Sequence, residues 1–326
     1  MKIFNLNPSG PMTVSWDLTS RCNFNCKHCF NRSGDDKYHD FSKELTLSES
    51  LEVCEQIIEM KPEVVCFCGG EPTLNKNLFV IGKKLTDVGI KVNMVSNGYL
   101  ISPEYAKKLK EMKINIVQIS LDSHIPSNHD LFRNHKDAFL HATQAIKNLT
   151  NEGIFTAVSM CPTKFNCECL EDYTLFVNNI GAKMIRIMPF LPMGRGFDNY
   201  LKFKPSNIQY LKLKYNIQKL MEKGFSIEFG DPLDHIKKAI EFERTFPLSI
   251  DIKADGKIGI SGYLPIFVGS VKRHSIKEYW NNGLSNIWDN KVVHETCDNL
   301  KTLDEFNTLY DGNKRLREFD LIDDKN

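Results

Sequence analysis

Residues 13–30 read Thr-Val-Ser-Trp-Asp-Leu-Thr-Ser-Arg-Cys-Asn-Phe-Asn-Cys-Lys-His-Cys-Phe. The first six favour a β-strand, and the polar, Asn-containing stretch after them indicates a loop at the carboxyl end of that strand. Cys22, Cys26 and Cys29 lie in this loop with the spacing C-x3-C-x2-C, which lets them converge on one metal centre. Thiolate ligands select zinc or an iron–sulfur cluster, so the stretch predicts a metal site at the end of the first strand.

Zinc is the first alternative for these thiols. A structural zinc site needs four ligands and usually joins one C-x2-C pair to another. No second C-x2-C pair stands at the distance that is usual in zinc fingers. His28 lies between two of the cysteines and is better placed as a wall of the site than as a fourth ligand. Three thiolates on a four-iron cluster leave one iron open, and an open iron can bind a substrate.

Beyond the cysteine loop, short strand-like runs alternate with amphipathic helical stretches as far as about residue 190. Such alternation predicts parallel βαβ units with right-handed crossovers. About six units indicate an α/β fold, a partial (β/α)6 TIM-like barrel with ligand sites at the carboxyl ends of its strands. The expected strands are 13–18, 64–68, 92–96, 114–121, 155–160 and 184–188, and the expected helices are 47–60, 77–88, 103–112, 138–152 and 169–180.

Helix-end signals support these elements. Thr46 and Glu49 form a capping-box pattern, and Ser102 precedes a proline at the first position of a helix. Glycines stand where three helices are expected to end, at Gly89, Gly153 and Gly181.

The rhythm changes after about residue 197. A long helix at 205–223 precedes a strand at 226–229, and a hairpin is expected from 249–253 and 257–261 around Asp255-Gly256. We therefore expect a core of residues 1–200 and a smaller α+β extension of residues 201–326.

Polar and glycine-containing motifs stand where the strands of the core are expected to end. Gly69 and Gly70 let the backbone approach a ligand closely, and Glu71 offers an acceptor to an ammonium group. Hydroxyl and amide side chains here suit ribose and carboxylate groups, although turn capping is the alternative for Ser96 and Ser120. The residues at these strand ends are Gly69, Gly70, Glu71, Pro72, Ser96, Asn97, Ser120, Asp122 and Met188.

The cysteine spacing, with His28 in the aromatic position before the last cysteine, resembles the signature of the radical S-adenosylmethionine (SAM) superfamily, and residues 69–72 resemble its GGEP motif. The resemblance implies a [4Fe-4S] cluster on Cys22, Cys26 and Cys29 whose open iron binds SAM. It also implies reductive cleavage of SAM to a 5′-deoxyadenosyl radical that abstracts a substrate hydrogen, while the protein binds, orients and excludes water. For Arg133 a surface salt bridge is the alternative. The implied SAM contacts are His28, Gly69, Gly70, Glu71, Pro72, Ser96, Asn97, Ser120, Asp122, Arg133 and Met188.

Residues 252–261, 269–271 and 275–280 resemble the SPASM extension, which marks many superfamily members that modify ribosomally made peptides and which normally binds auxiliary clusters. Here Ser261 stands where the first auxiliary cysteine is expected, and Leu300 fills the second position of a C-x2-C pair that begins at Cys297. One thiolate cannot hold a [4Fe-4S] cluster, so we expect one cluster in this chain. Two interpretations stay open for Cys297, a core thiol or a hydrogen-atom donor to a substrate radical.

Other residues carry weaker signals. Cys66 and Cys68 alternate on a strand and therefore face one side, as small residues of the barrel interior. Arg195 has a packing or ion-pair role, with substrate binding as the alternative. Three cysteines that follow the fifth strand are open to incidental, substrate-facing or ligand roles, namely Cys161, Cys167 and Cys169.

Composition and net charge limit the classes of partner that the chain is expected to bind. With 41% apolar and 25% charged residues, the 326-residue chain is an ordinary globular protein. A net charge of +1 and the absence of a basic extension argue against a nucleic-acid substrate such as transfer RNA. No apolar run approaches the roughly 18 residues needed to span a membrane, and no signal peptide is recognised. We expect a cytoplasmic protein with no nucleic-acid or membrane partner.

Three functions are weighed. The first is modification of a ribosomally synthesised peptide by cross-linking, epimerisation or excision, with a precursor peptide as substrate and a separate leader-peptide recognition protein as a further partner. The second is radical chemistry on a small molecule or cofactor intermediate. The third, a non-catalytic iron–sulfur sensor, is disfavoured by the complete set of SAM-binding motifs. Either enzyme needs an electron donor of the flavodoxin or ferredoxin type.

Overall fold

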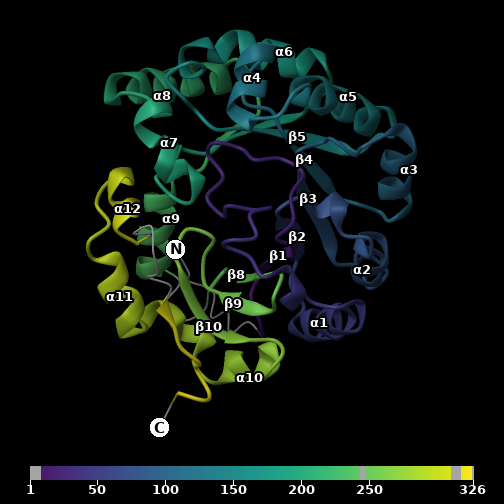
Figure 1. Ribbon diagram of the computed structural model, residues 1–326, viewed down its shortest axis with the longest axis vertical. Helices are drawn as coiled ribbons and strands as arrows, with labels where there is room; N and C mark the ends of the chain where they lie inside the picture. Colours follow the sequence, from purple (N-terminus) through teal and green to yellow (C-terminus); the bar gives the residue numbers. More distant parts are fainter. Residues whose placement is uncertain (1–8, 243–246, 310–316, 325–326) are drawn as a thin grey trace.

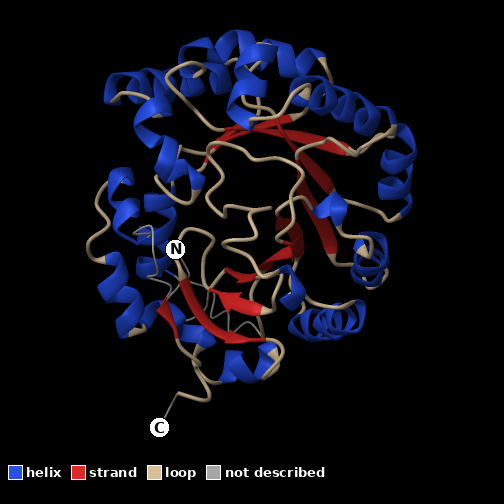
Figure 2. Cartoon of the chain, in the orientation of Figure 1, coloured by secondary structure: helices blue, strands red, loops and turns tan. Residues whose placement is uncertain are grey.

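The computed structural model describes residues 9–242, 247–309 and 317–324. Its strands form an arc with helices along the outer side (Figure 2). All the described strands belong to one sheet, in the order β11-β10-β9-β8-β1-β2-β3-β4-β5-β6-β7. The strand that precedes the cysteine loop, β1, therefore lies inside the sheet, with neighbours on both sides.

The strands from β1 to β7 pair in parallel, and helices connect them on the outside (Figure 1). The predicted α/β fold of parallel strand–helix units is confirmed. The bounds are β1 Thr13–Thr19, α1 Leu47–Met60, β2 Val64–Gly69, α2 Leu78–Thr86, β3 Lys91–Ser96, α3 Pro103–Glu111, β4 Ile116–Ser120, α4 Pro126–Arg133, α5 Ala138–Asn151, β5 Phe155–Met160, α6 Leu170–Asn179, β6 Met184–Ile187, α7 Arg195–Phe203, α8 Asn207–Glu222, β7 Ile227–Phe229 and α9 Pro232–Phe242.

Among the helices as far as α9, the sequence does not predict α4, α7 and α9. The first two are eight and nine residues long, and their N-cap residues, Ile125 and Gly194, make no side-chain cap hydrogen bond. Short helices without caps give weak sequence signals. The predicted helix ends are confirmed: Thr46 and Glu49 form a capping box, and the Ser102 hydroxyl accepts a hydrogen bond from the first turn of α3.

The C-terminal strands continue the same sheet. β8 (Ser249–Ile252) pairs in parallel with β1, and β9 (Lys257–Gly259) pairs antiparallel with β8, which confirms the predicted hairpin. β10 (Ile266–Ser270) and β11 (Arg317–Glu318) extend this edge, and α10 (Ile276–Asn281), α11 (Lys291–Cys297) and α12 (Phe306–Leu309) pack around it. Because β7 and β8 add to opposite sides of the first six strands, one sheet runs through both predicted regions. The boundary near residue 200 stays a prediction.

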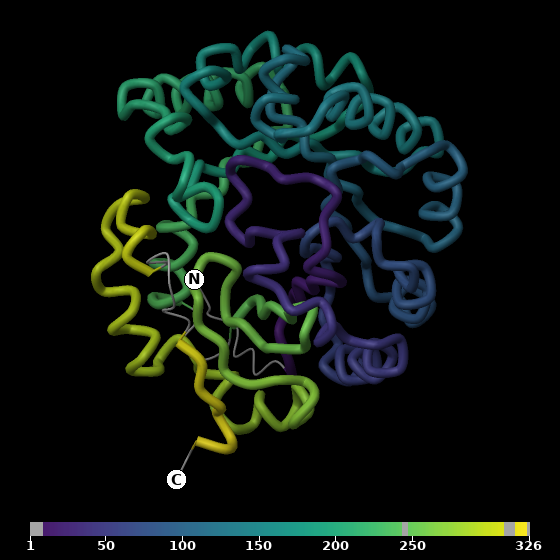
Figure 3. The backbone as a smooth tube through the Cα atoms, in the orientation of Figure 1, coloured from purple at the N-terminus to yellow at the C-terminus, as the bar shows by residue number. Residues whose placement is uncertain are grey.

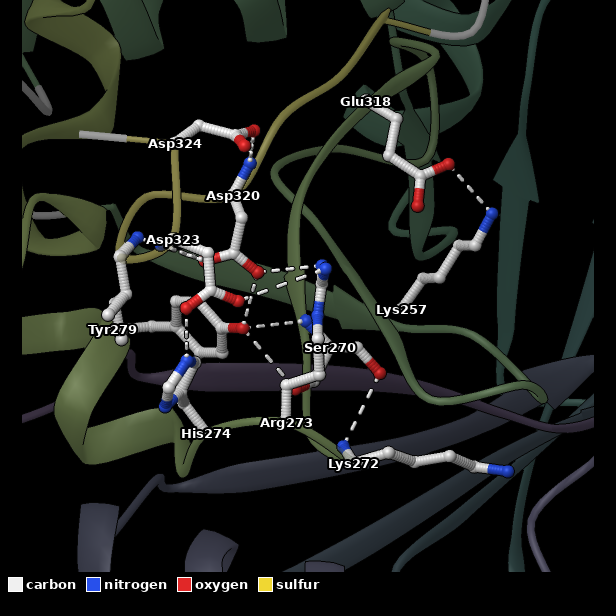
Figure 4. Close-up of polar contacts among 11 residues, drawn as sticks. Lys257, Ser270, Lys272, Arg273, His274, Tyr279, Glu318, Asp320, Asp323 and Asp324 are labelled. Atoms are coloured by element: carbon white, nitrogen blue, oxygen red, sulfur yellow. Dashed lines mark hydrogen bonds and ion pairs between the residues drawn. The ribbon is translucent and has the colours of Figure 1, made fainter. Parts of the chain in front are cut away.

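A polar cluster ties the segment 317–324 to the loop before α10 (Figure 4). Asp320 Oδ2 accepts from Arg273 at 2.6 Å and from the Tyr279 hydroxyl at 2.9 Å, while Asp323 Oδ1 contacts His274 Nε2 at 2.8 Å. The other Asp320 oxygen accepts from two backbone N–H groups of the turn that follows. Because these donors occupy both oxygens of the Asp320 carboxylate, the cluster has a structural role and holds residues 317–324 against the loop before α10.

The long connection from β1 to α1, residues 20–46, crosses the space that the strands and helices enclose (purple in Figure 3). It carries the three clustered cysteines, and the carboxyl ends of the parallel strands surround it. Among the described residues, no helix is long and apolar enough to cross a membrane.

Candidate active site

Cys22, Cys26 and Cys29 lie at the carboxyl end of β1. Cys26 is 8% exposed, and the other two are half-buried. The loop folds back on itself, since the Cys29 amide donates to the Cys26 carbonyl at 3.3 Å and the Phe24 amide to Cys22 Sγ at 3.4 Å. The loop thus presents its three thiols in one small region.

The electrostatics of the loop disfavour free thiolates. Burial, with a smaller contribution from the neighbouring thiols, raises the pKa of Cys22 to about 12 against the hydrogen bond from the Phe24 amide. Burial also raises the pKa of Cys26 to about 11, although Arg133 opposes the shift. Metal ligands must be deprotonated thiolates, so a bound metal centre has to displace these protons.

The spread of the three sulfurs bears on the kind of metal centre. Ligand atoms around one zinc ion, each about 2.3 Å from it, lie within 4 Å of one another. Among the residues that the structure describes, the set of three His, Cys or carboxylate ligand atoms within 4.8 Å of one another is His274, Asp320 and Asp323, not the cysteines. The three thiols therefore do not form so compact a set, an arrangement that is compatible with a larger, multi-iron cluster.

Gly194 and Arg195 brace the cysteine loop from the start of α7. The buried Arg195 donates from Nε to the Cys26 carbonyl and from a guanidinium N–H to the Ser33 carbonyl, both at 3.0 Å. Gly194 has φ 54°, and a Cβ there would clash with the Cys29 and Phe30 carbonyls. Of the two roles weighed for Arg195, its contacts account for packing.

We expect Arg195→Met to loosen the cysteine loop. Two hydrogen bonds from a buried cation are lost, which costs about 2–4 kcal/mol of unfolding free energy and lowers iron occupancy. Urea unfolding and iron content measure both effects. Arg317→Met is the matched control, because the Arg317 side chain is half-exposed and its contacts are long, 3.4 Å to the Val292 carbonyl and 4.0 Å to Glu295. Equal losses in the two variants would refute the bracing role.

Glu71 is the hub that joins two strand-end turns. Its buried carboxylate accepts from the Thr73 hydroxyl at 2.6 Å, the Ser96 hydroxyl at 2.8 Å and the Asn97 amide at 2.7 Å. Burial raises the pKa of Glu71, although these donors oppose the shift. The Asn97 side chain in turn donates to Asn23 of the cysteine loop at 2.8 Å. Glu71 and Ser96 therefore shape the site through protein partners.

The two glycines of the turn pass directly beside the cysteine loop. The Gly70 amide donates to the Thr19 carbonyl at 2.7 Å, and the Glu71 amide to the Arg21 carbonyl at 2.9 Å. A Cβ on Gly70 would clash with the Arg21 carbonyl, and Gly69 adopts φ 118°. Only glycine allows this approach, so the glycines fix the distance between the turn and the cysteines. Pro72, buried, starts the 3-10 turn Pro72–Leu74 that follows.

Asp122 and Arg133 form a buried ion pair behind Cys26. Arg133 Nε lies 2.6 Å from Asp122 Oδ2, and its Nη1 lies 4.0 Å from Cys26 Sγ. Burial alone would raise the pKa of Asp122, but Arg133, with smaller contributions from His28 and His129, outweighs burial and lowers the pKa to about 2. His129 Nδ1 accepts from the Asp122 amide at 3.0 Å, and burial lowers the His129 pKa to about 4. Arg133 is thus a buried partner of Asp122 and not a surface residue.

His28 stacks on Phe132, with ring centroids 4.2 Å apart and planes 14° apart. Burial lowers its pKa to about 3, so the ring is neutral, and its Nδ1 is buried with no partner among the described residues. An orphaned ring nitrogen next to the cysteines fits a site that a polar ligand completes. Ser120 is buried at the end of β4, and Met188 follows β6 with its sulfur 3.9 Å from the Tyr263 hydroxyl.

A cavity of about 650 Å³ lies between the cysteine loop and the C-terminal strands. The residues that line the cavity include Phe30 of the cysteine loop, Gly69 and Gly70 of the turn after β2, and Ser261 and Phe267 of the C-terminal region. The cavity therefore joins the predicted SAM site to the predicted extension.

The remaining cysteines lie elsewhere. Cys297 is buried in the hydrophobic core, and burial raises its pKa to about 12. It does not line the cavity, so its surroundings match the core-thiol interpretation; the hydrogen-donor role stays untested. Cys66 and Cys68 lie side by side on β2 with sulfurs 3.6 Å apart. Cys161 is packed against Phe132, Phe190, Tyr200 and Phe203; Cys167 and Cys169 form the 3-10 turn before α6.

The prediction of a single cluster is tested by iron content. Ser261 and Leu300 replace thiols of the expected auxiliary site, so the anaerobically reconstituted protein is expected to carry about four irons per chain. A value near eight, with matching sulfide, would show that an auxiliary cluster is bound.

Some site residues gave no sequence signal. Asn23 and Asn75 link the cysteine loop and β1 to later turns, the latter through a 2.7 Å bond to the Leu18 carbonyl. Both bonds join segments more than 50 residues apart in sequence. Their only local hint is an Asn within or after a motif, which is also ordinary in turns.

Known sequences are similar to the segment that carries the cysteine loop. Residues 16–177 match the model of the radical SAM superfamily. The chain is 24% identical over 294 residues to the AdoMet-dependent heme synthase of Methanosarcina barkeri, covering 84% of this chain and 83% of that protein. It is 30% identical over 234 residues to the mycofactocin maturase MftC of Mycolicibacterium smegmatis, covering 72% of this chain but only 57% of that relative.

Solved structures agree with the fold. SuiB of Streptococcus suis bound to S-adenosylmethionine superposes with a TM-score of 0.71 at 12% identity, covering 88% of this chain and 68% of SuiB. The matched family segment contains the cysteine loop, the glycine turn and the buried pair behind them, so the predicted radical SAM core is confirmed. Residues 16–177 of this chain therefore form a radical SAM domain, and the enzymes of that family use a [4Fe-4S] cluster and SAM.

Proposed function

We propose that this chain modifies a ribosomally made peptide, by cross-linking, epimerisation or excision. The observation that carries the proposal is the cavity of about 650 Å³ between the cysteine loop and the C-terminal strands. Its lining mixes aromatic, aliphatic and charged side chains from both regions, as a short peptide segment requires. The likeness to a protein named a maturase, and to SuiB, which was crystallised with the precursor peptide SuiA at a TM-score of 0.68, supports this choice.

In this proposal the chain's own residues have separate tasks. Cys22, Cys26 and Cys29 hold the cluster, and the bound cluster and SAM supply the one-electron chemistry that starts the reaction. The remaining predicted contacts, from the glycine turn to Met188, position SAM. Glu71 keeps the two adjacent turns rigid, and the neutral ring of His28 forms a wall of the site. The cavity walls hold the substrate close to SAM and keep water away from the radical.

A small-molecule substrate is the second candidate. The heme synthase relative is matched over 83% of its length, and the cationic side chains of Arg32, Lys37 and Lys43 line part of the cavity. Cations at a cavity edge suit a substrate with carboxylates, such as a tetrapyrrole.

The test uses the reconstituted enzyme under anaerobic conditions. Dithionite and SAM are expected to give 5′-deoxyadenosine, and co-expression with a small peptide encoded beside the gene is expected to change the mass of that peptide. A peptide of unchanged mass, together with conversion of an iron-coproporphyrin, would replace the first candidate by the second. No SAM cleavage with an intact cluster would refute both.

Further partners belong to the same proposal. We propose a separate leader-peptide recognition protein as a partner of the peptide substrate, and a flavodoxin- or ferredoxin-type electron donor in a cytoplasmic setting. Stimulation of SAM cleavage by reduced flavodoxin in place of dithionite tests the donor.

A further inference from the structure

A partly buried ionic group, formed by residues of β1, of β8 and of the position after β8, has no role in the site described above. Lys253 Nζ lies 3.2 Å from Asp17 Oδ2 and 3.7 Å from Asp251 Oδ2. Asp17 and Lys253 both line the cavity. Asp251 comes beside β1 through the parallel pairing in which Ser15 is its register partner. One ammonium group is therefore shared by two carboxylates, which leaves an excess of one negative charge.

One oxygen of this group has no hydrogen-bond donor. Asp251 is 7% exposed, and its Oδ2 is buried without a hydrogen-bond partner among the described residues. A Cβ built on Gly262, which lines the cavity, would lie 3.5 Å from this oxygen. Burial raises the pKa of Asp251, and the Asp17 carboxylate adds to the shift, while the Lys253 charge and a side-chain hydrogen bond from Ser15 only partly offset it. An unsatisfied buried carboxylate oxygen is destabilising, and proteins tolerate it where a ligand supplies the missing donor.

The group also lies next to the predicted SAM site. Gly69 packs so closely on β1 that a Cβ there would lie 3.2 Å from the Asp17 Cα. Asp17 is the register partner of Cys68, the residue before Gly69. A substrate group held by the two carboxylates would therefore lie one residue layer from the glycine turn.

The charges select the kind of ligand. An anion is disfavoured, because Lys253 is already shared by two carboxylates. A cationic hydrogen-bond donor satisfies the free oxygen and balances the excess charge. We propose that Asp251, together with Asp17, forms a subsite for a cationic nitrogen group of the substrate, an ammonium or a guanidinium. The claim that the subsite binds a basic side chain of a peptide rests on the function proposed above. The claim that the subsite selects cations does not.

Thermal unfolding of the reconstituted protein tests the subsite with simple probes. n-Butylammonium chloride and n-butylguanidinium chloride are expected to raise the Tm, and sodium butyrate at the same ionic strength is not. Asp251→Asn keeps the shape of the side chain, and the variant protein is expected to keep its iron content. The apparent affinity of the variant for the cations is expected to be at least about tenfold weaker.

Asp255→Asn is the matched control, since Asp255 lines the same cavity but accepts a bond from the Lys257 amide within its own turn. It is expected to respond like the unmodified protein. Equal shifts with butyrate and butylammonium in the unmodified protein, or an unchanged response in Asp251→Asn, would overturn the proposal. Modification of a peptide without any cation response would refute the subsite alone, and a cation response without any modified peptide would refute only the proposed function.

Discussion

Replacing Cys26 by alanine is expected to leave the reconstituted protein nearly free of iron and unable to cleave SAM. Of the three thiols Cys26 is the most buried, at 8% exposure, and Arg195 already binds its backbone carbonyl. The loop therefore has little freedom to bring another ligand to the same place. Two remaining thiolates do not hold a [4Fe-4S] cluster firmly, because such clusters are bound by several cysteines together. Iron and sulfide per chain, and the yield of 5′-deoxyadenosine after reduction, measure the effect.

Cys169→Ala is the matched control for this loss. Cys169 is half-buried and lies in the 3-10 turn before α6, outside the cysteine loop. Iron content and SAM cleavage are expected to stay at the level of the unmodified protein. Iron retained by Cys26→Ala, or lost from Cys169→Ala, would show that the ligand set proposed for the cluster is wrong.

The fold was predictable where its signals are local. Six parallel strands follow from short apolar runs bounded by turns, and the caps at Thr46 and Ser102 lie within a few residues of the helices that they start. Strand partners are a different matter. Residues 226–229 were recognised as a strand, but nothing nearby in sequence indicates that β7 pairs with β6, or that β8 pairs with β1 more than 230 residues away. Such pairings depend on the whole core, so the sequence alone suggested a separate extension.

The site divides in the same way. The thiols and the glycine turn were found because their chemistry is written in contiguous motifs. The partners of the buried charged groups were not found: Glu71 is bonded to Ser96 and Asn97, about 25 residues later. The subsite at Asp251 is visible only once β8 lies beside β1. Motifs therefore predicted which residues surround the cofactors, and the structure shows which of them are held by other protein groups.

Arg133→Met is expected to destabilise the protein by about 3–5 kcal/mol, because it leaves the carboxylate of Asp122 buried without its counter-charge. Both side chains are at most 10% exposed, and their atoms are 2.6 Å apart. Urea unfolding measures the loss. Lys83→Met provides the control: Lys83 and Asp87 form a similarly short pair at 2.8 Å, but both side chains are about half-exposed, so a loss of less than about 1 kcal/mol is expected. Equal losses would show that burial does not govern the effect.

The pH dependence separates lost charge compensation from lost packing. In the unmodified protein Arg133 is the main group that lowers the pKa of Asp122 to about 2, below its ordinary value, against the effect of burial. The pair therefore stabilises the fold above the unfolded pKa, and the contribution is lost as pH falls through about 2. Without Arg133, burial raises the pKa of Asp122 instead, and His129, 3.7 Å away, ionises more readily as pH falls. The difference between variant and unmodified protein is therefore expected to be largest near about pH 8 and to shrink towards about pH 4. A difference that does not change with pH would mean that the arginine acts through packing of its aliphatic chain and not through its charge.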